Sequence, residues 1–292
     1  MQKKIREEYA NWTNDLNKDK YNLMITNDMD SLLSAMFLKH HFGLEVNSFF
    51  SFHSISKINP MDQREPIGVD AALATGKTFD NHLTRLNANS YFNTESANIN
   101  LVSNVHRDCY TDKFAMSTLI QLYALYNIPL PETVQGKMIL LCCDVGFKGY
   151  YDERFRDTFL SYLEKFEMME LVEVLEMYTK DQLYWFMLRA EMDISIRLQQ
   201  SGKNKGKLCF DSSGNNPDLT ARWEQRIDLK WYEKHLGYPV ELPEASFETV
   251  EKFAARTIEW DELDSMTMDR AFSYAFINKR KIMISERKES QL

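Results

Sequence analysis

Four acidic groups follow short apolar runs in the first half of the chain. In order along the sequence they are Asp28 with Asp30, then Asp70, then Asp80 with Asn81 and His82, and finally Asp144. Carboxylates that are brought together repel one another and lose hydration unless cations lie among them. Carboxylate oxygens with one or two nitrogen ligands suit Mg²⁺ or Mn²⁺ better than softer metals. The pattern predicts a hydrolytic site with two divalent metal ions.

The same acids also have a structural interpretation, as turn residues and helix N-caps. Asp28 or Asp30 would cap a helix formed by the residues that follow. For any single Asp this interpretation is the better one. Four acids in this order, each after an apolar run, favour the metal site.

The apolar runs before the acids are typical of buried parallel strands. Strands are expected over 21–26, 44–52, 67–69, 78–79 and 138–143. Helices are expected over 31–42, ending at Gly43 as a C-cap, and over 113–126. Because ligands bind where the carboxyl ends of parallel strands meet, the acids should converge there. The predicted fold is α/β, with a parallel sheet of about five strands flanked by helices.

The remaining segments predict a second domain after residue 150. Helices are expected over 3–18, 152–178, 180–200, 220–236 and 246–258, an irregular loop over 87–112, and one or two strands over 271–285. The first domain is assigned to residues 1–150 and the second, mostly helical α+β, to residues 151–292, with a hinge at 145–151.

The order of the acidic groups resembles the DHH phosphoesterase superfamily. This superfamily includes RecJ-type exonucleases, small-RNA and cyclic-dinucleotide phosphodiesterases, and family II pyrophosphatases. Its members carry Asp-x-Asp after the first strand, a lone Asp, an Asp-His-His and a further Asp. Here the similarity covers about the first half of the chain. The resemblance implies a metal-dependent phosphoesterase that hydrolyses phosphodiester bonds in nucleic acid or short oligonucleotides.

The resemblance also implies a set of metal ligands. Asp28 and Asp30 would each hold one ion, and Asp70 would bridge the two. Asp144 would hold the second ion. The cofactor would be Mn²⁺ or Mg²⁺, with two ions expected and one possible. A bridging carboxylate can keep two ions about 3.5–4 Å apart, a spacing suited to in-line displacement at phosphorus.

The central motif departs from the family, because Asn81 stands at the position of the first histidine. An amide oxygen can bind a hard cation but is less basic than imidazole. Three possibilities remain open: Asn81 is a weaker ligand, His82 replaces it, or one metal site is lost. In the family the Asp orients the histidines and the second His contacts phosphate. The resemblance therefore makes Asp80 and His82 the candidate catalytic residues.

Two further departures favour a different function. Thr26 supplies neither the acid nor the histidine that relatives carry near this position, and residues 202–214 lack the family's glycine-rich substrate motif. The alternative to an enzyme is a diverged member that keeps the fold and binds a protein or a nucleotide.

Candidate substrate contacts lie before the helix expected over 113–126. His106, Arg107 and Lys113 are placed where the family has phosphate-contacting groups, and a helix N-terminus favours anions. A solvated polar loop is the alternative for each of them. The expected substrate is a single-stranded nucleic acid, an oligonucleotide or a nucleotide.

Composition limits the remaining classes. The chain has 292 residues, 44% of them hydrophobic, which is ample for a packed core. Its net charge of −8 argues against a surface that binds nucleic acid over its whole extent. A local basic groove is still compatible with this charge. The four cysteines form no Cys-x-x-Cys pair, which indicates buried reduced thiols. With no secretory signal or membrane-spanning run, we expect a cytoplasmic protein without membrane contact. Binding of a protein partner and assembly into a homo-oligomer are both compatible with the sequence.

Overall fold

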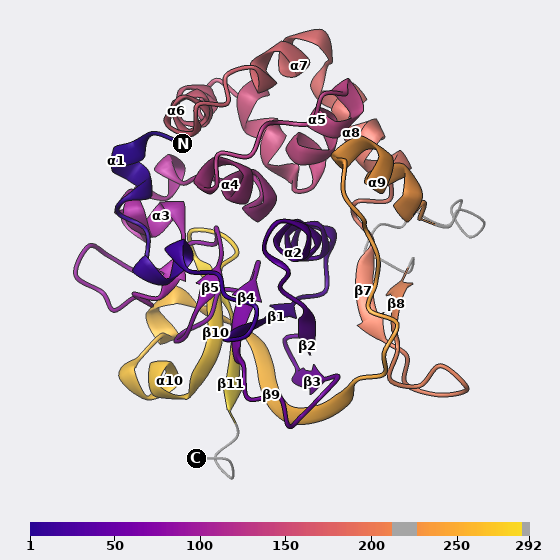
Figure 1. Ribbon diagram of the computed structural model, residues 1–292. Coiled ribbons are helices and arrows are strands. Elements are labelled where there is room, and N and C mark those ends of the chain that lie inside the picture. Colours follow the sequence, from indigo (N-terminus) through magenta and orange to yellow (C-terminus); the bar gives the residue numbers. More distant parts are fainter. Residues whose placement is uncertain (212–226, 288–292) are drawn as a thin grey trace.

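The computed structural model describes residues 1–211 and 227–287, and its strands form a curled mixed sheet and a small ribbon (Figure 1). The strands of the sheet are β1 (Tyr21–Ile25), β2 (Val46–Phe50), β3 (Ser54–Lys57), β4 (Glu65–Val69), β5 (Thr78–Phe79), β6 (Ser96–Ala97), β9 (Glu248–Glu259), β10 (Ala271–Phe276) and β11 (Lys281–Arg287). Their order is β10-β11-β9-β3-β2-β1-β4-β5-β6. The ribbon pairs β7 (Ser195–Leu198) with β8 (Leu208–Asp211).

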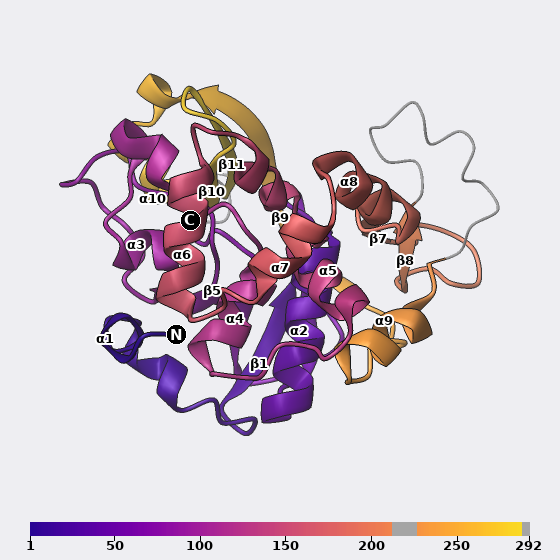
Figure 2. The same ribbon diagram turned by 90° about the horizontal axis from the view of Figure 1, so that it is seen from above.

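The helices lie mainly on one side of the sheet. The α-helices are α1 (Lys3–Arg6), α2 (Met29–Phe42), α3 (Ile99–Val102), α4 (Thr118–Leu125), α5 (Val134–Cys142), α6 (Arg156–Phe166), α7 (Leu171–Met177), α8 (Lys180–Arg189), α9 (Leu229–Leu236) and α10 (Ser265–Arg270). The 3-10 helices are η1 (Asn11–Asn14), η2 (Arg107–Asp112), η3 (Val145–Tyr151) and η5 (Trp260–Glu262). Helices α2 and α4 lie next to the sheet, and α5 to α8 lie farther out (Figures 1 and 2). Within the described ranges, no helix combines the length and apolar composition needed to cross a bilayer.

The α/β class and a five-stranded parallel core are confirmed. Strands β2, β1, β4, β5 and β6 pair in parallel. The strand predicted over 138–143 is wrong, because these residues lie in and just after helix α5, and β6 is the fifth parallel strand instead. Thr133 caps α5 by accepting a hydrogen bond from Gly136 N at 3.0 Å. A buried helix and a buried strand both give a continuous apolar run, so periodicity alone does not separate them.

The helix predicted over 246–258 is also wrong, because strand β9 runs through this segment. β9 pairs antiparallel with β3 on one side and with β11 on the other. Its Glu, Lys and Ala residues favour a helix locally, but pairing on both sides outweighs that preference. The strands expected over 271–285 are confirmed as β10 and β11.

Several predicted helices are shorter or divided. The segment 31–42 is confirmed as α2, which ends at Gly43 with a left-handed φ of 71°. The segment 3–18 contains only α1 and η1, the helix expected over 113–126 begins at Thr118, and 152–200 divides into α6, α7, α8 and β7. The segment 87–112, expected to be an irregular loop, contains β6, α3 and the whole of η2. Residues 212–226 lie outside the described residues, so the end of the segment 202–214 and the start of the segment 220–236 are not described. The remainder of the second segment contains α9.

The curl of the sheet brings β10 against the loops that follow β4 and β5. Tyr274 N donates a hydrogen bond to Ala72 O at 3.0 Å, and Phe276 N donates to Leu83 O at 2.8 Å. The loops after β4 and β5, which carry Asp70 and Asp80, are therefore held by backbone hydrogen bonds to β10, a strand from the C-terminal part of the chain. The sheet contains strands from both sides of residue 150, while the domain boundary itself stays a prediction.

Candidate metal centre

Three side chains at the carboxyl ends of β4 and β5 form a compact group. Asp70, Asp80 and His82 each offer one ligand atom, and these atoms lie within 4.8 Å of one another. His82 Nδ1 is 2.7 Å from Asp80 Oδ1 and 3.8 Å from Asp70 Oδ1. Both carboxylates are buried, whereas the imidazole is 43% exposed. Two oxygen donors and one nitrogen donor fit a Mg²⁺ or Mn²⁺ ion.

Asp28 joins this group from the end of β1. Its carboxylate caps α2 by accepting a hydrogen bond from Ser31 N at 2.9 Å. Its carboxyl also lies close enough to that of Asp70 for each to shift the pKa of the other. Asp28 therefore both caps α2 and lies beside the candidate ligands.

Asp30 is held mainly by the protein itself. Its Oδ2 accepts a hydrogen bond from Thr118 N at 2.7 Å, and its Oδ1 accepts one from Leu119 N at 3.0 Å. Oδ1 also accepts from Ser34 Oγ at 3.2 Å and from Cys143 Sγ at 3.4 Å. The backbone donors stand at the N-terminus of α4, whose dipole favours a carboxylate. Since three donors surround Oδ1, Oδ2 is the atom with room for a cation.

Asp70 has an unusual backbone conformation. Its φ of 54° lies in the left-handed region, which costs a residue other than glycine about 1–3 kcal/mol. Its Oδ1 accepts a hydrogen bond from Thr118 Oγ1 at 2.8 Å. The N-terminus of α4 therefore positions both Asp30 and Asp70.

Asn98 orients the other carboxylate of the group, and sequence analysis missed it. Asn98 Nδ2 donates to Asp80 Oδ2 at 3.1 Å and to His82 O at 2.8 Å. This leaves Asp80 Oδ1 facing the imidazole. The available signal was weak, because Asn98 follows a strand of two residues inside a segment expected to be irregular.

Asn81 is occupied by contacts outside the group. Its side-chain Nδ2 donates to Met116 O, and its backbone O accepts from Asn100 Nδ2 at 2.6 Å. No hydrogen bond joins the Asn81 side chain to an acidic residue or to His82 in the described part of the chain. Of the three possibilities raised by the sequence, this geometry favours His82 as the nitrogen ligand.

We expect Asn81→Asp to lower the unfolding free energy of the metal-free protein by about 1–3 kcal/mol. The change removes the amide donor to Met116 O and places a negative charge beside that carbonyl. Urea denaturation followed by circular dichroism measures the effect. Asn89→Asp, at an exposed position, is the matched control. Equal midpoints for both variants would contradict the proposed contact.

Asp144 reaches the site from the end of a helix rather than a strand. It follows α5 and caps η3, with its Oδ1 accepting from Val145 N. Its negative charge raises the pKa of both Asp28 and Asp30. The predicted strand was wrong, yet Asp144 lies close enough to act on the predicted cluster.

The clustered charges shift the protonation of the site. Burial, followed by the charges of Asp28 and Asp144, raises the pKa of Asp30 to about 7. Burial and the charges of Asp30 and Asp28 raise the pKa of Asp70 well above its usual range. For His82, burial lowers the pKa, but the neighbouring carboxylates, chiefly those of Asp80 and Asp70, outweigh it and raise the pKa to about 10. Without a cation, the site compensates its negative charge by holding protons.

The predicted substrate-binding cations are engaged with neighbours outside this group. Arg107 stacks on Trp260, with its guanidinium carbon 3.7 Å from the ring centre. Lys113 Nζ lies 3.2 Å from Tyr110 Oη. Neither cation makes a hydrogen bond or ion pair with the acidic group within the described residues.

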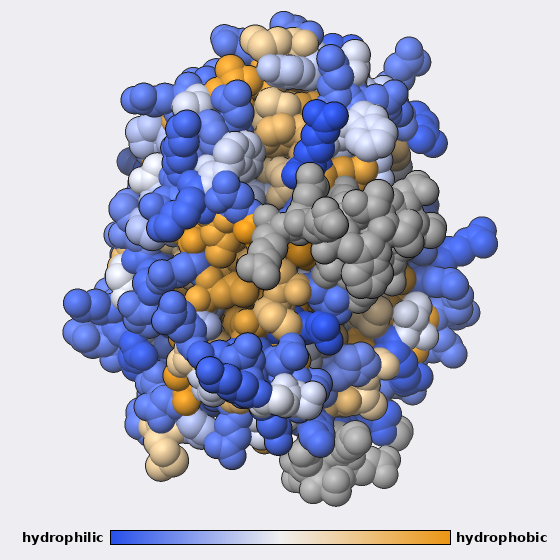
Figure 3. All heavy atoms as spheres, turned by 90° about the vertical axis from the view of Figure 1, so that its right-hand side faces the viewer, coloured by the Kyte–Doolittle hydropathy of each residue, from blue (hydrophilic) through white to orange (hydrophobic). Residues whose placement is uncertain are grey.

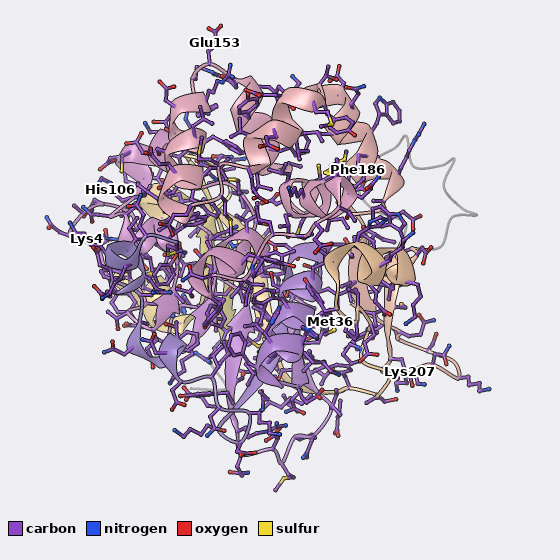
Figure 4. All side chains as sticks on the ribbon, turned by 45° about the horizontal axis from the view of Figure 1, so that its top comes forward. Lys4, Met36, His106, Glu153, Phe186 and Lys207 are labelled. Carbon is purple, nitrogen blue, oxygen red and sulfur yellow. The ribbon has the colours of Figure 1, made fainter. Side chains whose placement is uncertain are left out.

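His106 is likewise engaged locally. Its Nδ1 accepts a hydrogen bond from Asp108 N at 3.3 Å and caps η2. Figure 4 shows His106 on the side of the molecule that carries Lys4, whereas Phe186 and Lys207 lie on the other side. Substrate contact by His106, Arg107 or Lys113 therefore stays a prediction.

A large cavity between α5, α8 and α9 is separate from the acidic group. It has a volume of about 810 Å³, and Trp185, Phe186 and Trp231 are among its lining residues. Figure 3 shows apolar surface on the face of the molecule that carries α8 and α9. Neither the candidate metal ligands nor the predicted substrate contacts line this cavity.

Comparison of the chain with protein-family models, with curated proteins and with solved structures found no match.

Proposed function

We propose that the protein is a metal-dependent phosphoesterase similar to the DHH superfamily, which hydrolyses phosphodiester bonds in nucleic acid or short oligonucleotides. The observation that carries this proposal is the group of Asp70, Asp80 and His82 at the carboxyl edge of the parallel strands. Hard oxygen donors and one imidazole nitrogen suit Mn²⁺ or Mg²⁺, with two ions expected and one possible. Bound divalent ions would polarise the phosphoryl group and stabilise the negative charge of in-line displacement.

The chain's own residues have distinct tasks in this proposal. Asp70 and Asp80 supply carboxylate oxygens, with Asp28 and Asp144 beside them for a second ion. Asp80 also holds His82 through Nδ1, which directs the other ring nitrogen, Nε2, away from that carboxylate. Because the imidazole is partly exposed, Nε2 is the ring nitrogen that can bind an ion or, if the ion is held by the carboxylates alone, contact a phosphate that enters from solvent.

The alternative function is binding without catalysis, and two observations favour it. The Asp30 carboxylate has four protein donors, and the Asn81 amide is bound to a backbone carbonyl. Both positions are metal ligands in the family that the sequence resembles. A chain that uses them to hold its own structure would bind a nucleotide or a protein on the same fold.

Titration with MnCl₂ separates these functions. We expect Mn²⁺ to raise the melting temperature, because a ligand at a hundred times its Kd adds about 2.7 kcal/mol of stability. We also expect Mn²⁺-dependent cleavage of an end-labelled single-stranded oligonucleotide. Stabilisation without cleavage of this oligonucleotide or of bis(p-nitrophenyl) phosphate would favour the binding function. A protein that Mn²⁺ and Mg²⁺ leave unaffected would contradict the metal centre itself.

The remaining proposals concern surroundings and partners. We propose a cytoplasmic location, where the four free cysteines would stay reduced. The substrate would be a single-stranded nucleic acid, an oligonucleotide or a nucleotide, with no membrane contact. A protein partner or a homo-oligomer is compatible with this function.

A further inference from the structure

A second cavity is lined by residues from both halves of the curled sheet. Its volume is about 670 Å³, and residues of β1 to β4 and of β9 to β11 line it. None of the candidate metal ligands lines this cavity, so it is a separate feature of the molecule.

The inner part of this cavity is apolar. Met24, Ile55 and Leu73 line it and are buried, with exposed fractions of 3%, 7% and 6%. The ring of Phe272 adds a partly exposed aromatic wall from β10. A volume of this size with an apolar lining is typical of sites for small organic ligands.

The cations around the cavity differ in whether they are paired with an acid. Its lining contains three cations, Lys57, Lys77 and Arg287, but only two acids, Glu65 and Glu251. Lys77 Nζ lies 2.7 Å from Glu65 Oε1, and Arg287 Nε lies 3.0 Å from Glu251 Oε1. Lys57 forms no ion pair or hydrogen bond within the described residues. Lys77 Nζ also lies 3.1 Å from Glu95 Oε1, so Lys57 is the lining cation without an ion pair within the described residues.

A buried hydroxyl stands next to this lysine. Ser48 is 1% exposed, and its Oγ has no hydrogen-bond partner among the described residues. Ser48 and Lys57 are direct partners across β2 and β3, and both line the cavity. A buried hydroxyl without a partner costs free energy, which an acceptor on a ligand would recover.

We propose that this cavity binds an amphipathic monoanion, an acyl chain or aromatic group that carries one carboxylate. The carboxylate would contact the Lys57 ammonium group and accept a hydrogen bond from Ser48 Oγ. The apolar body would lie against Met24, Leu73 and Phe272. One carboxylate matches the one ammonium group that has no ion pair among the described residues, and the apolar lining disfavours a small, fully hydrated anion such as acetate.

Calorimetric titration of the full chain with octanoate tests the proposal. Octan-1-ol has the same chain without the charge and should bind about tenfold more weakly, because a charge-assisted hydrogen bond is lost. Lys57→Met keeps the apolar stem and should weaken octanoate binding about tenfold, with little effect on octan-1-ol. Lys57→Arg should retain octanoate binding, and Lys205→Met, in an exposed loop, is the matched control.

Three results would overturn the proposal. The first is octanoate that binds the wild-type protein no better than octan-1-ol. The second is octylamine that binds as tightly as octanoate, and the third is a Lys57→Met variant with unchanged octanoate binding. The last result would place octanoate elsewhere, for example in the cavity beside Trp185. If Lys57→Met does not fold, Ser48→Ala tests the same head-group contact, and unchanged octanoate affinity in that variant is equally decisive.

Discussion

Replacing Asp70 with Asn should lower the Mn²⁺-dependent rate of oligonucleotide cleavage by about a hundredfold or more, since a catalytic metal supplies several kcal/mol. The charge of Asp28 acts on Asp70, and Asp70 Oδ1 lies 3.8 Å from His82 Nδ1, so Asp70 is central to the candidate ligands. Asn keeps the side-chain size, can accept the hydrogen bond from Thr118 Oγ1, and tolerates a positive φ. The fold should therefore survive while the ligand charge is lost.

The measurement needs initial rates at saturating Mn²⁺ and a melting curve without metal. Asp19→Asn, which removes an exposed carboxylate outside the group, is the control and should leave both quantities unchanged. An Asp70→Asn variant that cleaves as fast as wild type would show that Asp70 is no metal ligand. A variant that loses its fold without metal would show instead that Asp70 is chiefly structural.

Raising the pH should destabilise the metal-free protein, and Mn²⁺ should remove that effect. The pKa of Asp30 is about 7 in the folded protein against 3.8 for an ordinary carboxyl, so the folded state keeps a proton that the unfolded state releases. As the pH rises from 3.8 to about 7, the free energy of unfolding should therefore decrease, by an amount on the order of a few kcal/mol. The raised pKa of Asp70 acts in the same direction.

His82 extends this trend to higher pH. Its protonated form is stabilised by the carboxylates of Asp80 and Asp70, so its contribution is complete below pH 6.5 and disappears as the pH approaches 10. Cations bind the deprotonated ligands, so stabilisation by Mn²⁺ should increase with pH. Urea midpoints in EDTA and in MnCl₂, between about pH 5 and about pH 8, measure both trends.

Asp28→Asn is the informative variant for this experiment. Asn caps a helix as well as Asp does, so the bond from Ser31 N can persist while one negative charge is removed. The metal-free variant should be at least as stable as wild type at pH 8, with a flatter pH profile and a smaller gain from Mn²⁺. A pH-independent midpoint in the wild-type protein would mean that the carboxylates are not electrostatically coupled.

The sequence was informative where a strand is short, apolar and followed directly by an acid. Such patterns placed Asp28, Asp70 and Asp80 at the ends of β1, β4 and β5, where the structure has them. The same reasoning failed before Asp144, because a helix buried among other helices is as uniformly apolar as a central strand. Its acid still acts on the group, since the end of α5 points to the same region.

Other parts of the site depend on contacts that the local sequence does not encode. Asn98 acts on Asp80 only because β6 pairs with β5, and a strand of two residues has no readable periodicity. The backbone donors to Asp30 come from α4, far away in the sequence. The strand β9 was mistaken for a helix because its partners, β3 and β11, determine its conformation more than its composition does.

The backbone bonds from β10 to the loops after β4 and β5 have a consequence for biosynthesis. A ribosome makes all the acidic residues of the group early, but the strand that clamps their loops emerges only after residue 271. Such distant pairings form slowly, because long loops must close first. A nascent chain therefore carries the acids long before their loops are fixed. A frameshift or nonsense mutation ahead of β10 would remove these bonds. The loops that carry Asp70 and Asp80 would then lose their support, even though every acid is still present.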